Sequence, residues 1–446
     1  MSDSEAAQTS SKTGDRRNLA ARGAALEALR QVTEKGVALD AALNAQGAWR
    51  ALEPRDRAFA YASAAAAVRR AGALDHAVSR HLKHPLPDDQ LRARLILRLA
   101  AAELLVLQAA PHAAVDAGVE LMGAKRETMR YRKLANAVLR KVAADGHEAF
   151  AEADPLEDLP AWLAGRWIRT YGEARARAMA EARAGAPPLD LTLKPAEDPT
   201  AWADRLEAEI LPGGTLRRPA IGDVTALEGF EDGAWWLQDA AAAIPVGLLK
   251  PQPGERIADI GAAPGGKTMQ LAAAGAEVIA LDRSETRLKR LEANLARTGL
   301  SAEIVVADAA RWRPEAALDA VLLDAPCTAT GTLRRNPDVA FSKSGADIER
   351  LATLQARLLD AAVETLKPGG RLVYCTCSLE PEEGEHQIAA LVERRSDLRR
   401  DAIAPADLPG LEDAIDAQGA VRTTPDMWPD RGGLDGFYIA RLIKAG

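Results

Sequence analysis

The chain has 446 residues, of which 48% are hydrophobic and 27% charged, and its formal net charge is −7. At about 100–200 residues per domain, this length predicts several domains and excludes a single small module. The composition excludes a collagen-like or largely disordered chain. A membrane-spanning helix needs about 18 consecutive apolar residues, and the sequence has no such run. The polar N-terminus also lacks the apolar segment of a signal peptide.

Cysteine content and charge distribution suggest where the protein works and what it binds. Three cysteines are too few for a disulfide framework, so we expect a reducing, cytoplasmic setting. Residues 1–150 contain 23 Lys and Arg against 17 Asp and Glu, although the whole chain is acidic. This basic front part favours a polyanion such as nucleic acid as a partner. The alternative is an ordinary solvated helical surface.

The first third of the chain is predicted to be helical. Residues 1–15 are polar and lack aromatic side chains, and we expect a disordered tail there. In residues 16–148, apolar side chains such as Leu95 and Leu99 recur at helical spacing, which predicts a domain of six or seven helices. Residues 125–141 carry seven basic side chains beside an apolar face, as a basic amphipathic helix would.

The composition changes twice in the rest of the chain. Residues 149–234 are rich in proline, and five of the eight tryptophans lie between residues 150 and 240. A strand-like run at 188–195 and a helical pattern at 201–210 predict a small α+β subdomain there. In residues 235–446 strands and helices alternate, which predicts a Rossmann-like α/β domain with a mostly parallel sheet. Its expected strands are 256–260, 277–281, 302–306, 318–323, 371–375 and 436–443, and its expected helices are 268–274, 284–298, 346–366 and 384–394.

A glycine-rich turn follows the first expected strand of this α/β domain, in the string IADIGAAPGGKT at 257–268. Such a turn lets backbone N–H groups and a helix N-terminus face a ligand. The last eight residues also match the Walker A pattern of P-loop NTPases, with Lys267 and Thr268 at its end. A P-loop enzyme would need a magnesium-binding carboxylate on a later strand, which Asp324 could supply.

Three carboxylates end successive expected strands. Asp282 lies about 20 residues after the glycine turn, where an acid suits the two hydroxyls of a ribose. Asp308 suits an adenine amino group, and Asp324 ends the next strand in the string LLDAPC. Taken singly, each could simply cap the helix that follows its strand. Together with the glycine turn they favour an S-adenosylmethionine site over an ATPase site.

All three cysteines, Cys327, Cys375 and Cys377, are expected at strand ends, where ligands of open α/β sheets bind. A lone cysteine is more often a small buried hydrophobe. The tight C-x-C spacing, with only His386 nearby, disfavours zinc, and we predict no metal. A thiolate that adds to C6 of a pyrimidine makes C5 nucleophilic enough to take a methyl group. Methylation of an amino group would need no thiol.

On these residues the chain resembles the RsmB/Sun family of RNA (cytosine-5) methyltransferases. The resemblance covers residues 235–387 densely, through the strings WLQDAA, DIGAAPGGKT, LDRS, ADAA, LLDAPCTATGTLRRNPD and VYCTCSLEPEEGE. The helical part resembles the NusB-type RNA-binding domain in EPRDRAFAY, PHAAVDAGVELMGAK and LANAVLRK. This combination implies an enzyme of small-subunit (16S) ribosomal RNA, either naked or in an assembly intermediate, rather than a tRNA enzyme. We expect a monomer that works away from membranes.

The resemblance also implies roles for individual residues. Cys377 would be the C6 nucleophile, Cys327 would assist breakdown of the covalent adduct, and Asp324, supported by Lys267, would hold the cytosine edge. S-adenosylmethionine would be held by Ala262, Ala263, Pro264, Gly265, Gly266, Lys267, Asp282, Asp308 and Asp324. The RNA would lie near Arg334, Arg335 and Asn336 and, from charge alone, on Arg130, Arg132, Lys133, Arg140 and Lys141.

The chain departs from the family pattern at two places. Gly261 stands where many members have Cys or Ala, which we expect to be harmless. Thr328, Ala329 and Thr330 replace Ser-Gly-Thr, and we expect this bulkier loop to shift Cys327 and slow product release. The additional thiol of Cys375 is expected to be a packing residue. Two alternatives stay open, a non-catalytic RNA-binding assembly factor and a P-loop NTPase.

Overall fold

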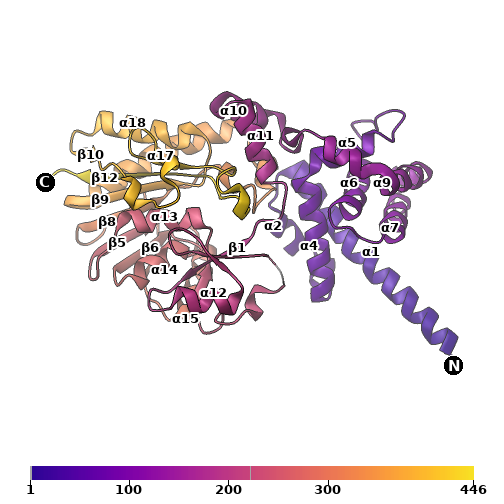
Figure 1. Cartoon of the computed structure of the whole chain (residues 1–446), viewed down its shortest axis with the longest axis horizontal. Coiled ribbons are helices and arrows are strands. Elements are labelled where there is room, and N and C mark those ends of the chain that lie inside the picture. The colour runs from indigo at the N-terminus through magenta and orange to yellow at the C-terminus, as the bar shows by residue number, and fades with distance from the viewer. Residues whose placement is uncertain (1–2, 221) are drawn as a thin grey trace. The chain divides into compact units, whose positions relative to one another are not determined.

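The computed structural model describes residues 3–220 and 222–446, with side chains from residue 19 onward. It divides the chain into two compact units. The helical unit contains residues 1–184 together with 336–344, and the α/β unit contains residues 185–335 together with 345–446. The all-helical first part and the mixed sheet that follows it in the chain confirm the predicted fold class (Figure 1).

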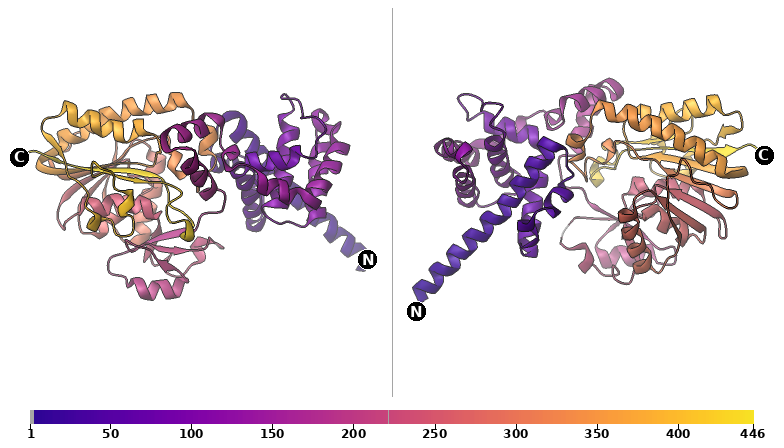
Figure 2. Two further views of the ribbon diagram at one scale, coloured as in Figure 1. Left: turned by 45° about the horizontal axis from the view of Figure 1, so that its top comes forward. Right: turned by 180° about the vertical axis from the view of Figure 1, so that it is seen from behind.

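The helical unit is built from α1 to α11, one short 3-10 helix and the returning segment 336–344. Helix α1 begins at Asp3, which differs from the disordered tail expected for residues 1–15. That segment contains no proline, the residue that interrupts a helix most strongly. The indigo ribbon of α1 runs without a break in the right view of Figure 2. The elements are α1 (Asp3–Lys35), α2 (Leu39–Asn44), α3 (Gly47–Arg50), α4 (Pro54–Arg69), α5 (Ala71–Ser79), α6 (Leu91–Leu105), α7 (Pro111–Gly123), α8 (Arg126–Met129), α9 (Arg132–Glu152), η1 (Pro155–Asp158), α10 (Ala161–Tyr171), α11 (Glu173–Ala182) and α16 (Val339–Ser342).

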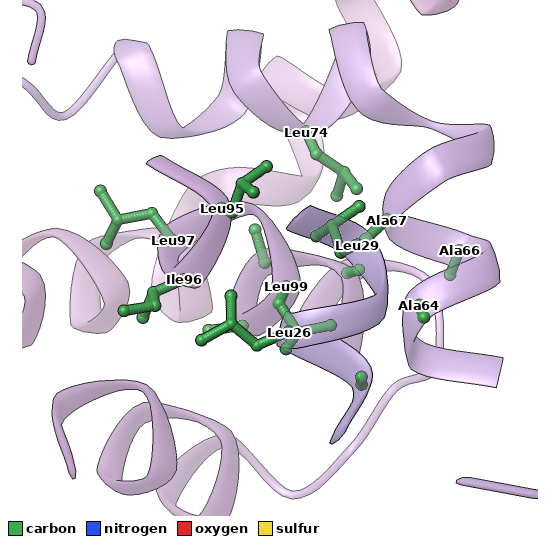
Figure 3. Close-up of a cluster of buried hydrophobic side chains, with 14 of the residues drawn as sticks. Leu26, Leu29, Ala64, Ala66, Ala67, Leu74, Leu95, Ile96, Leu97 and Leu99 are labelled. Carbon is green, nitrogen blue, oxygen red and sulfur yellow. The ribbon is translucent and has the colours of Figure 1, made fainter. Parts of the chain in front are cut away.

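The core of this unit is made of alanine and leucine. Figure 3 shows Leu26 and Leu29 of α1 facing alanines of α4, with Leu95 and Leu99 of α6 beside them. Alanine side chains let the helix backbones approach closely, and leucine fills the remaining space. A buried ion pair also links α1 to α6, because Arg22 of α1 donates to both carboxylate oxygens of Glu103 of α6.

The helical unit extends further along the chain than the boundary at residue 148 that the sequence suggested. Asp158 of η1 is buried and accepts hydrogen bonds from Arg70 Nε at 2.7 Å and from the backbone N–H of Ala73 at 3.0 Å. A Cβ at Gly72 would lie 2.1 Å from the carbonyl oxygen of Glu157, so this close approach requires glycine. These interactions bind the segment after α9 to the helices before it.

Residues 336–344 also belong to the helical unit, although the sequence placed them in the methyltransferase-like domain. The carboxylate of Asp338 accepts a hydrogen bond from the backbone N–H of Leu39, 299 residues away in the chain, and Phe341 packs against the helical core. The chain therefore leaves the α/β unit at Arg335 and returns to it at Gly345.

The α/β unit contains two sheets. The small one has the order β2-β3-β1-β4, with each neighbouring pair antiparallel, and the large one has the order β10-β12-β9-β8-β5-β6-β7 with β11 paired to β12. The strands are β1 (Leu189–Leu193), β2 (Glu209–Ile210), β3 (Leu216–Arg218), β4 (Trp235–Leu237), β5 (Arg256–Ile260), β6 (Glu277–Asp282), β7 (Glu303–Val306), β8 (Leu318–Asp324), β9 (Leu366–Thr376), β10 (Leu398–Arg400), β11 (Val421–Thr423) and β12 (Phe437–Lys444). The helices are α12 (Pro199–Leu206), η2 (Val224–Ala226), α13 (Ala240–Leu249), α14 (Gly266–Ala273), α15 (Glu285–Thr298), η3 (Thr330–Thr332), α17 (Gly345–Thr365), η4 (Pro381–Glu383), α18 (Glu385–Arg394), η5 (Pro405–Asp407), η6 (Glu412–Ala414) and η7 (Pro429–Arg431).

Helices cover both faces of the large sheet, as the alternating pattern predicted (Figure 1). Helices α17 and α18 pack on one face, while α13 and α14 pack on the other. Strands β5, β6, β7, β8 and β9 are parallel, and β12 is antiparallel to β9. The strand order reverses across the sheet between β5 and β8, and ligands of such sheets bind outside the strand ends at this switch point.

The small sheet is fixed to the large one by two adjacent tryptophans. Successive side chains of a strand point to opposite faces. Trp235 of β4 therefore packs with Trp202 in the core of the small sheet, whereas Trp236 packs against α14 and α15. For this reason residues 185–234 belong with the α/β unit and do not form a separate domain with residues 149–184.

Candidate active site

The glycine turn after β5 brings the chain against the end of β8. Gly261 has φ +83°, and a Cβ there would lie 2.2 Å from the carbonyl oxygen of Asp324, so only glycine fits at this position. Its backbone N–H bonds to the carbonyl oxygen of Leu281. Gly265, with φ +111°, is the N-cap residue that directly precedes α14. The departure from the family pattern at Gly261 therefore suits the local backbone of this chain.

Lys267 and Thr268, which completed the Walker A match, both bond to carboxylates of the protein itself. Lys267 Nζ lies 2.7 Å from Asp324 Oδ2, and Thr268 Oγ1 donates to Asp259 Oδ2 at 2.6 Å. Thr268 and Asp259 are both fully buried, so this hydroxyl does not face a ligand. This arrangement disfavours the P-loop NTPase.

Lys267 is charged where it meets Asp324. Burial disfavours its charge, but the neighbouring side chains, Asp324 first among them, together outweigh burial, and the net effect raises the pKa of Lys267 above its usual value. The Lys267 ammonium also lies 5.3 Å from the ring centre of Phe437. Burial raises the pKa of the neighbouring Asp259 to about 7. The lysine therefore holds the Asp324 carboxylate in a fixed position at the end of β8.

A cavity of about 270 Å³ opens at the carboxyl ends of β5, β6 and β8. Three of the predicted carboxylates line it, namely Asp282, Asp308 and Asp324, together with Gly261. The turn residues Ala262–Gly266 and Lys267 are not among its lining residues in the described part of the chain. Its full lining is Ile260, Gly261, Leu281, Asp282, Arg283, Arg287, Ala307, Asp308, Ala309, Asp324, Ala325, Pro326, Cys327, Ala329, Leu354, Leu358 and Cys377.

Arg287 of α15 ties the glycine turn to the first carboxylate of the cavity. It lies 3.0 Å from Asp282 Oδ2 and donates to the carbonyl oxygen of Ala263. Asn294, further along the same helix, donates to the carbonyl oxygen of Pro264 at 3.0 Å. These interactions give the turn 262–266 a structural role: the carbonyl oxygens of Ala263 and Pro264 accept hydrogen bonds from α15, and Arg287 links the turn to Asp282.

Two of the three thiols meet at this cavity. The sulfurs of Cys327 and Cys377 lie 3.5 Å apart, and both residues line the cavity. Cys375 is fully buried on the α13 face of the sheet. A hydrogen bond with Cys377 and burial raise the pKa of the Cys327 thiol well above its usual value, and burial does the same for Cys375. Burial and the neighbouring thiol therefore disfavour the thiolate form of Cys327, and burial disfavours that of Cys375.

Arg334 and Arg335, expected near RNA, are held in a buried group of ion pairs. Arg334 is 1% exposed and lies near Asp435, at 3.7 Å from Oδ1. Arg335 contacts Asp239 Oδ2 at 2.7 Å and Asp190 Oδ2 at 3.4 Å. These arginines fix the end of the Cys327 loop to β1 and to the start of α13. Their side chains are thus placed to support the loop, and a role near RNA stays a prediction.

The basic residues expected on the helical unit do lie at its surface. Arg130, Arg132, Lys133, Arg140 and Lys141 are all exposed. Helix α9 buries its opposite face through Ala135, Val138, Leu139 and Val142. The amphipathic helix predicted from this segment is therefore present, beginning at Arg132 after the short helix α8.

Comparison with known proteins identifies the family. The profile described as 16S rRNA methyltransferase RsmB/F matches residues 246–443, and the NusB family profile matches residues 19–144. A curated protein of Cronobacter sakazakii, ribosomal RNA small subunit methyltransferase B, is 33% identical over 440 residues, which are 95% of this chain and 98% of that protein. The chain belongs to the RsmB/Sun methyltransferase family. Its relative of the same description in Shigella flexneri is 33% identical over 96% of this chain and 99% of the relative.

Solved structures agree on the fold. The crystal structure of PH0851 superposes with a TM-score of 0.72 at 23% identity, covering 96% of this chain and 99% of that one. A methyltransferase homologue from Pyrococcus horikoshii gives a TM-score of 0.52 at 30% identity, covering 63% of this chain and 94% of that one. No helix in the described part of the chain is long and apolar enough to cross a membrane.

Proposed function

We propose that this RsmB/Sun family member methylates C5 of a cytosine in small-subunit (16S) ribosomal RNA, with S-adenosylmethionine as methyl donor and a covalent bond between Cys377 and C6. The observation that carries the proposal is the pair of sulfurs 3.5 Å apart beside a carboxylate-lined cavity. The names of the curated relatives support the RNA substrate.

The cavity has the chemistry that S-adenosylmethionine would need. Asp282 is only 4% exposed and offers a carboxylate that ribose hydroxyls can donate to. Asp308 offers a second acceptor, and Leu354 and Leu358 of α17 supply apolar surface for the adenine. When bound, the cofactor supplies an electrophilic methyl group. The turn 262–266 would support this site through Asp282 and the backbone.

The Asp324 carboxylate explains why the target base would be cytosine and not uracil. A carboxylate accepts a hydrogen bond from the N4 amino group of cytosine, whereas uracil presents an oxygen at that position. The ion pair with Lys267 at 2.7 Å fixes the carboxylate at the end of β8, next to the loop that carries Cys327. We infer that Asp324 holds the base edge and that Lys267 acts through Asp324.

The two thiols are assigned to different steps. A hydrogen bond with Cys377 and burial raise the pKa of the Cys327 thiol, which favours Cys377 as the group that attacks C6. The Cys377 sulfur gives up its proton to solvent as it bonds to C6, and C5 becomes nucleophilic enough to take the methyl group. Cys327, whose sulfur lies 3.5 Å from that of Cys377, then assists loss of the C5 proton to solvent, and elimination releases Cys377.

Nucleoside analysis tests the proposed function. The protein is incubated with S-adenosylmethionine and unmodified 16S ribosomal RNA, and the digested RNA is examined by mass spectrometry. We expect 5-methylcytidine from the parent protein and from Cys375→Ala, because Cys375 is a packing residue, and none from Cys377→Ala. Binding of RNA and of S-adenosylmethionine without any methylated product would favour the assembly factor. A methyl group on another atom would contradict the proposal.

A further inference from the structure

The carboxylate of Glu383 lies at the meeting point of the two cysteine loops. Glu383 ends the short helix η4 and is fully buried. Its Oε1 accepts a hydrogen bond from the backbone N–H of Thr328 at 3.0 Å, and its Oε2 accepts from Ser378 Oγ at 2.6 Å. Thr328 directly follows Cys327, and Ser378 directly follows Cys377. One carboxylate therefore binds the residue after each of the two thiols.

Further hydrogen bonds complete this arrangement. The hydroxyl of Thr328 also donates to Glu383 Oε2. The hydroxyls of Thr328 and Ser378 lie 3.1 Å apart, so the two loops also meet directly. An ionised carboxylate is acceptor-only and has about four lone-pair sites. Here its two oxygens meet donors from several sides, and a neutral side chain of the same shape could not accept from all of them.

The Glu383 side chain is itself held in place. Gln355 of α17 is fully buried, and its Nε2 donates to Glu383 Oε1 at 3.0 Å and to the carbonyl oxygen of Pro326 at 2.9 Å. Tyr374 of β9 donates from its hydroxyl to the carbonyl oxygen of Glu383 at 2.7 Å. Pro326 directly precedes Cys327, so the Cys327 loop is bound on both sides of its thiol. The carboxylate is thus anchored to a helix and to a central strand.

We propose that Glu383 is a positioning residue that sets the distance between the Cys327 and Cys377 sulfurs by binding Thr328 and Ser378. The catalytic meaning of this distance rests on the proposed function. The sulfurs are 3.5 Å apart although 50 residues separate them in the chain, and hydrogen bonds to buried groups are the interactions that hold such loops together. Glu383 does not line the cavity and acts only through its two partners.

Thiol crosslinking measures this distance without RNA or cofactor. Diamide takes two electrons and two protons from a pair of thiols, becomes the hydrazine, and leaves a disulfide between the sulfurs. We expect the parent protein to form the bond between Cys327 and Cys377 rapidly, as peptide mapping would show. In Glu383→Gln an amide NH₂ replaces one acceptor oxygen and faces donors, so the loops separate. We expect crosslinking about 10-fold slower or more. Glu393→Gln, an exposed residue of α18, is the matched control and should behave like the parent.

Two further variants separate the two loops. Ser378→Ala removes the hydroxyl on the Cys377 side, and Thr328→Val removes the hydroxyl on the Cys327 side. In single-turnover assays with 16S ribosomal RNA, we expect Ser378→Ala to slow formation of the protein–RNA adduct. Thr328→Val should instead slow its breakdown, so that adduct accumulates. Binding of S-adenosylmethionine should stay unchanged in both, because neither residue lines the cavity.

The outcomes distinguish this inference from the proposed function. Equal crosslinking and equal kinetics in the parent, Glu383→Gln and Glu393→Gln would overturn the positioning role. A second outcome is that Glu383→Gln crosslinks more slowly than the parent protein while the parent itself forms no RNA adduct. That outcome would support the positioning role and contradict the proposed chemistry. If Glu383→Gln does not fold, the single-hydroxyl variants Ser378→Ala and Thr328→Val decide. The positioning role is then overturned if neither variant changes the crosslinking rate, Ser378→Ala does not slow adduct formation and Thr328→Val does not slow adduct breakdown.

Discussion

The sulfurs of Cys327 and Cys377 lie 3.5 Å apart at the ends of two neighbouring parallel strands. Strand β8 leads into the Cys327 loop, and Cys377 follows β9 directly. Pairing of Asp324 with Cys375 in the sheet fixes the register of these two strands. Strand pairing therefore sets how far along the sheet each thiol lies, and the two loops set the distance between the sulfurs.

The buried carboxyl group of Asp259 makes stability depend on pH. Its folded-state pKa is about 7, above the ordinary value of 3.8, so between these values the folded state holds a proton that the unfolded state has lost. Stability from this group is therefore lost as pH rises from about 4 to about 7. In Asp259→Asn this loss is absent.

Urea unfolding of the parent protein and Asp259→Asn at pH 5 and pH 8 checks this expectation. An amide in place of the carboxyl group disturbs the buried hydrogen bond from Thr268, which should make the variant less stable at pH 5. The deficit of the variant should become smaller at pH 8. A deficit that is the same at both pH values, or that grows with pH, would show that Asp259 titrates at its ordinary value in the folded protein.

Ala329 lies in the Cys327 loop, in a backbone conformation that favours glycine. Its φ is 58° and its ψ 25°, the left-handed region, where a residue with a Cβ costs about 1–2 kcal/mol. Ala329→Gly removes this cost but adds unfolded-state entropy of roughly 0.5–1 kcal/mol. We expect a net gain of up to about 1.5 kcal/mol in unfolding free energy, measured by urea denaturation. Faster breakdown of the RNA adduct in this variant would also bear out the expectation that the bulkier loop slows release. A clear loss of stability would show that the Ala329 methyl group packs favourably.

The exposed basic residues of α9 are expected to bind RNA phosphates. Arg132→Ala combined with Lys133→Ala should weaken RNA binding and lower the slope of log affinity against log salt by about 1 for each phosphate that is no longer bound. Filter binding over a range of salt concentrations measures this slope. Lys83→Ala, an exposed lysine outside α9, serves as the control. If affinity and slope match those of the control, α9 presents only a solvated surface.

Local patterns in the sequence predicted the sheet well, because alternation of strands and helices depends on neighbouring residues. The expected strand 256–260 coincides with β5, and the expected helix 284–298 with α15 within one residue. Proximity of Asp282, Asp308, Asp324, Cys327 and Cys377 could also be expected, since all follow or end parallel strands. Such strand ends meet at one edge of a sheet.

Interactions between distant segments could not be predicted in the same way. Arg334 and Arg335 looked like surface cations because their partners Asp190, Asp239 and Asp435 lie far away in the sequence. The role of Glu383 was equally hidden, although the residue lies in the motif string VYCTCSLEPEEGE. Its donors come from a loop 55 residues away as well as from its own, and only the fold brings them together.

Covalent trapping tests the central claim most directly. The parent protein, Cys377→Ala, Cys327→Ala and Cys375→Ala are each incubated with S-adenosylmethionine and 16S ribosomal RNA that contains 5-fluorocytosine, and denaturing gels then reveal stable adducts. Fluorine at C5 cannot leave as a proton does, so elimination is blocked and the adduct persists. We predict an adduct with the parent, with Cys327→Ala and with Cys375→Ala, and none with Cys377→Ala. An adduct that survives in Cys377→Ala and disappears in Cys327→Ala would contradict the assignment of the nucleophile.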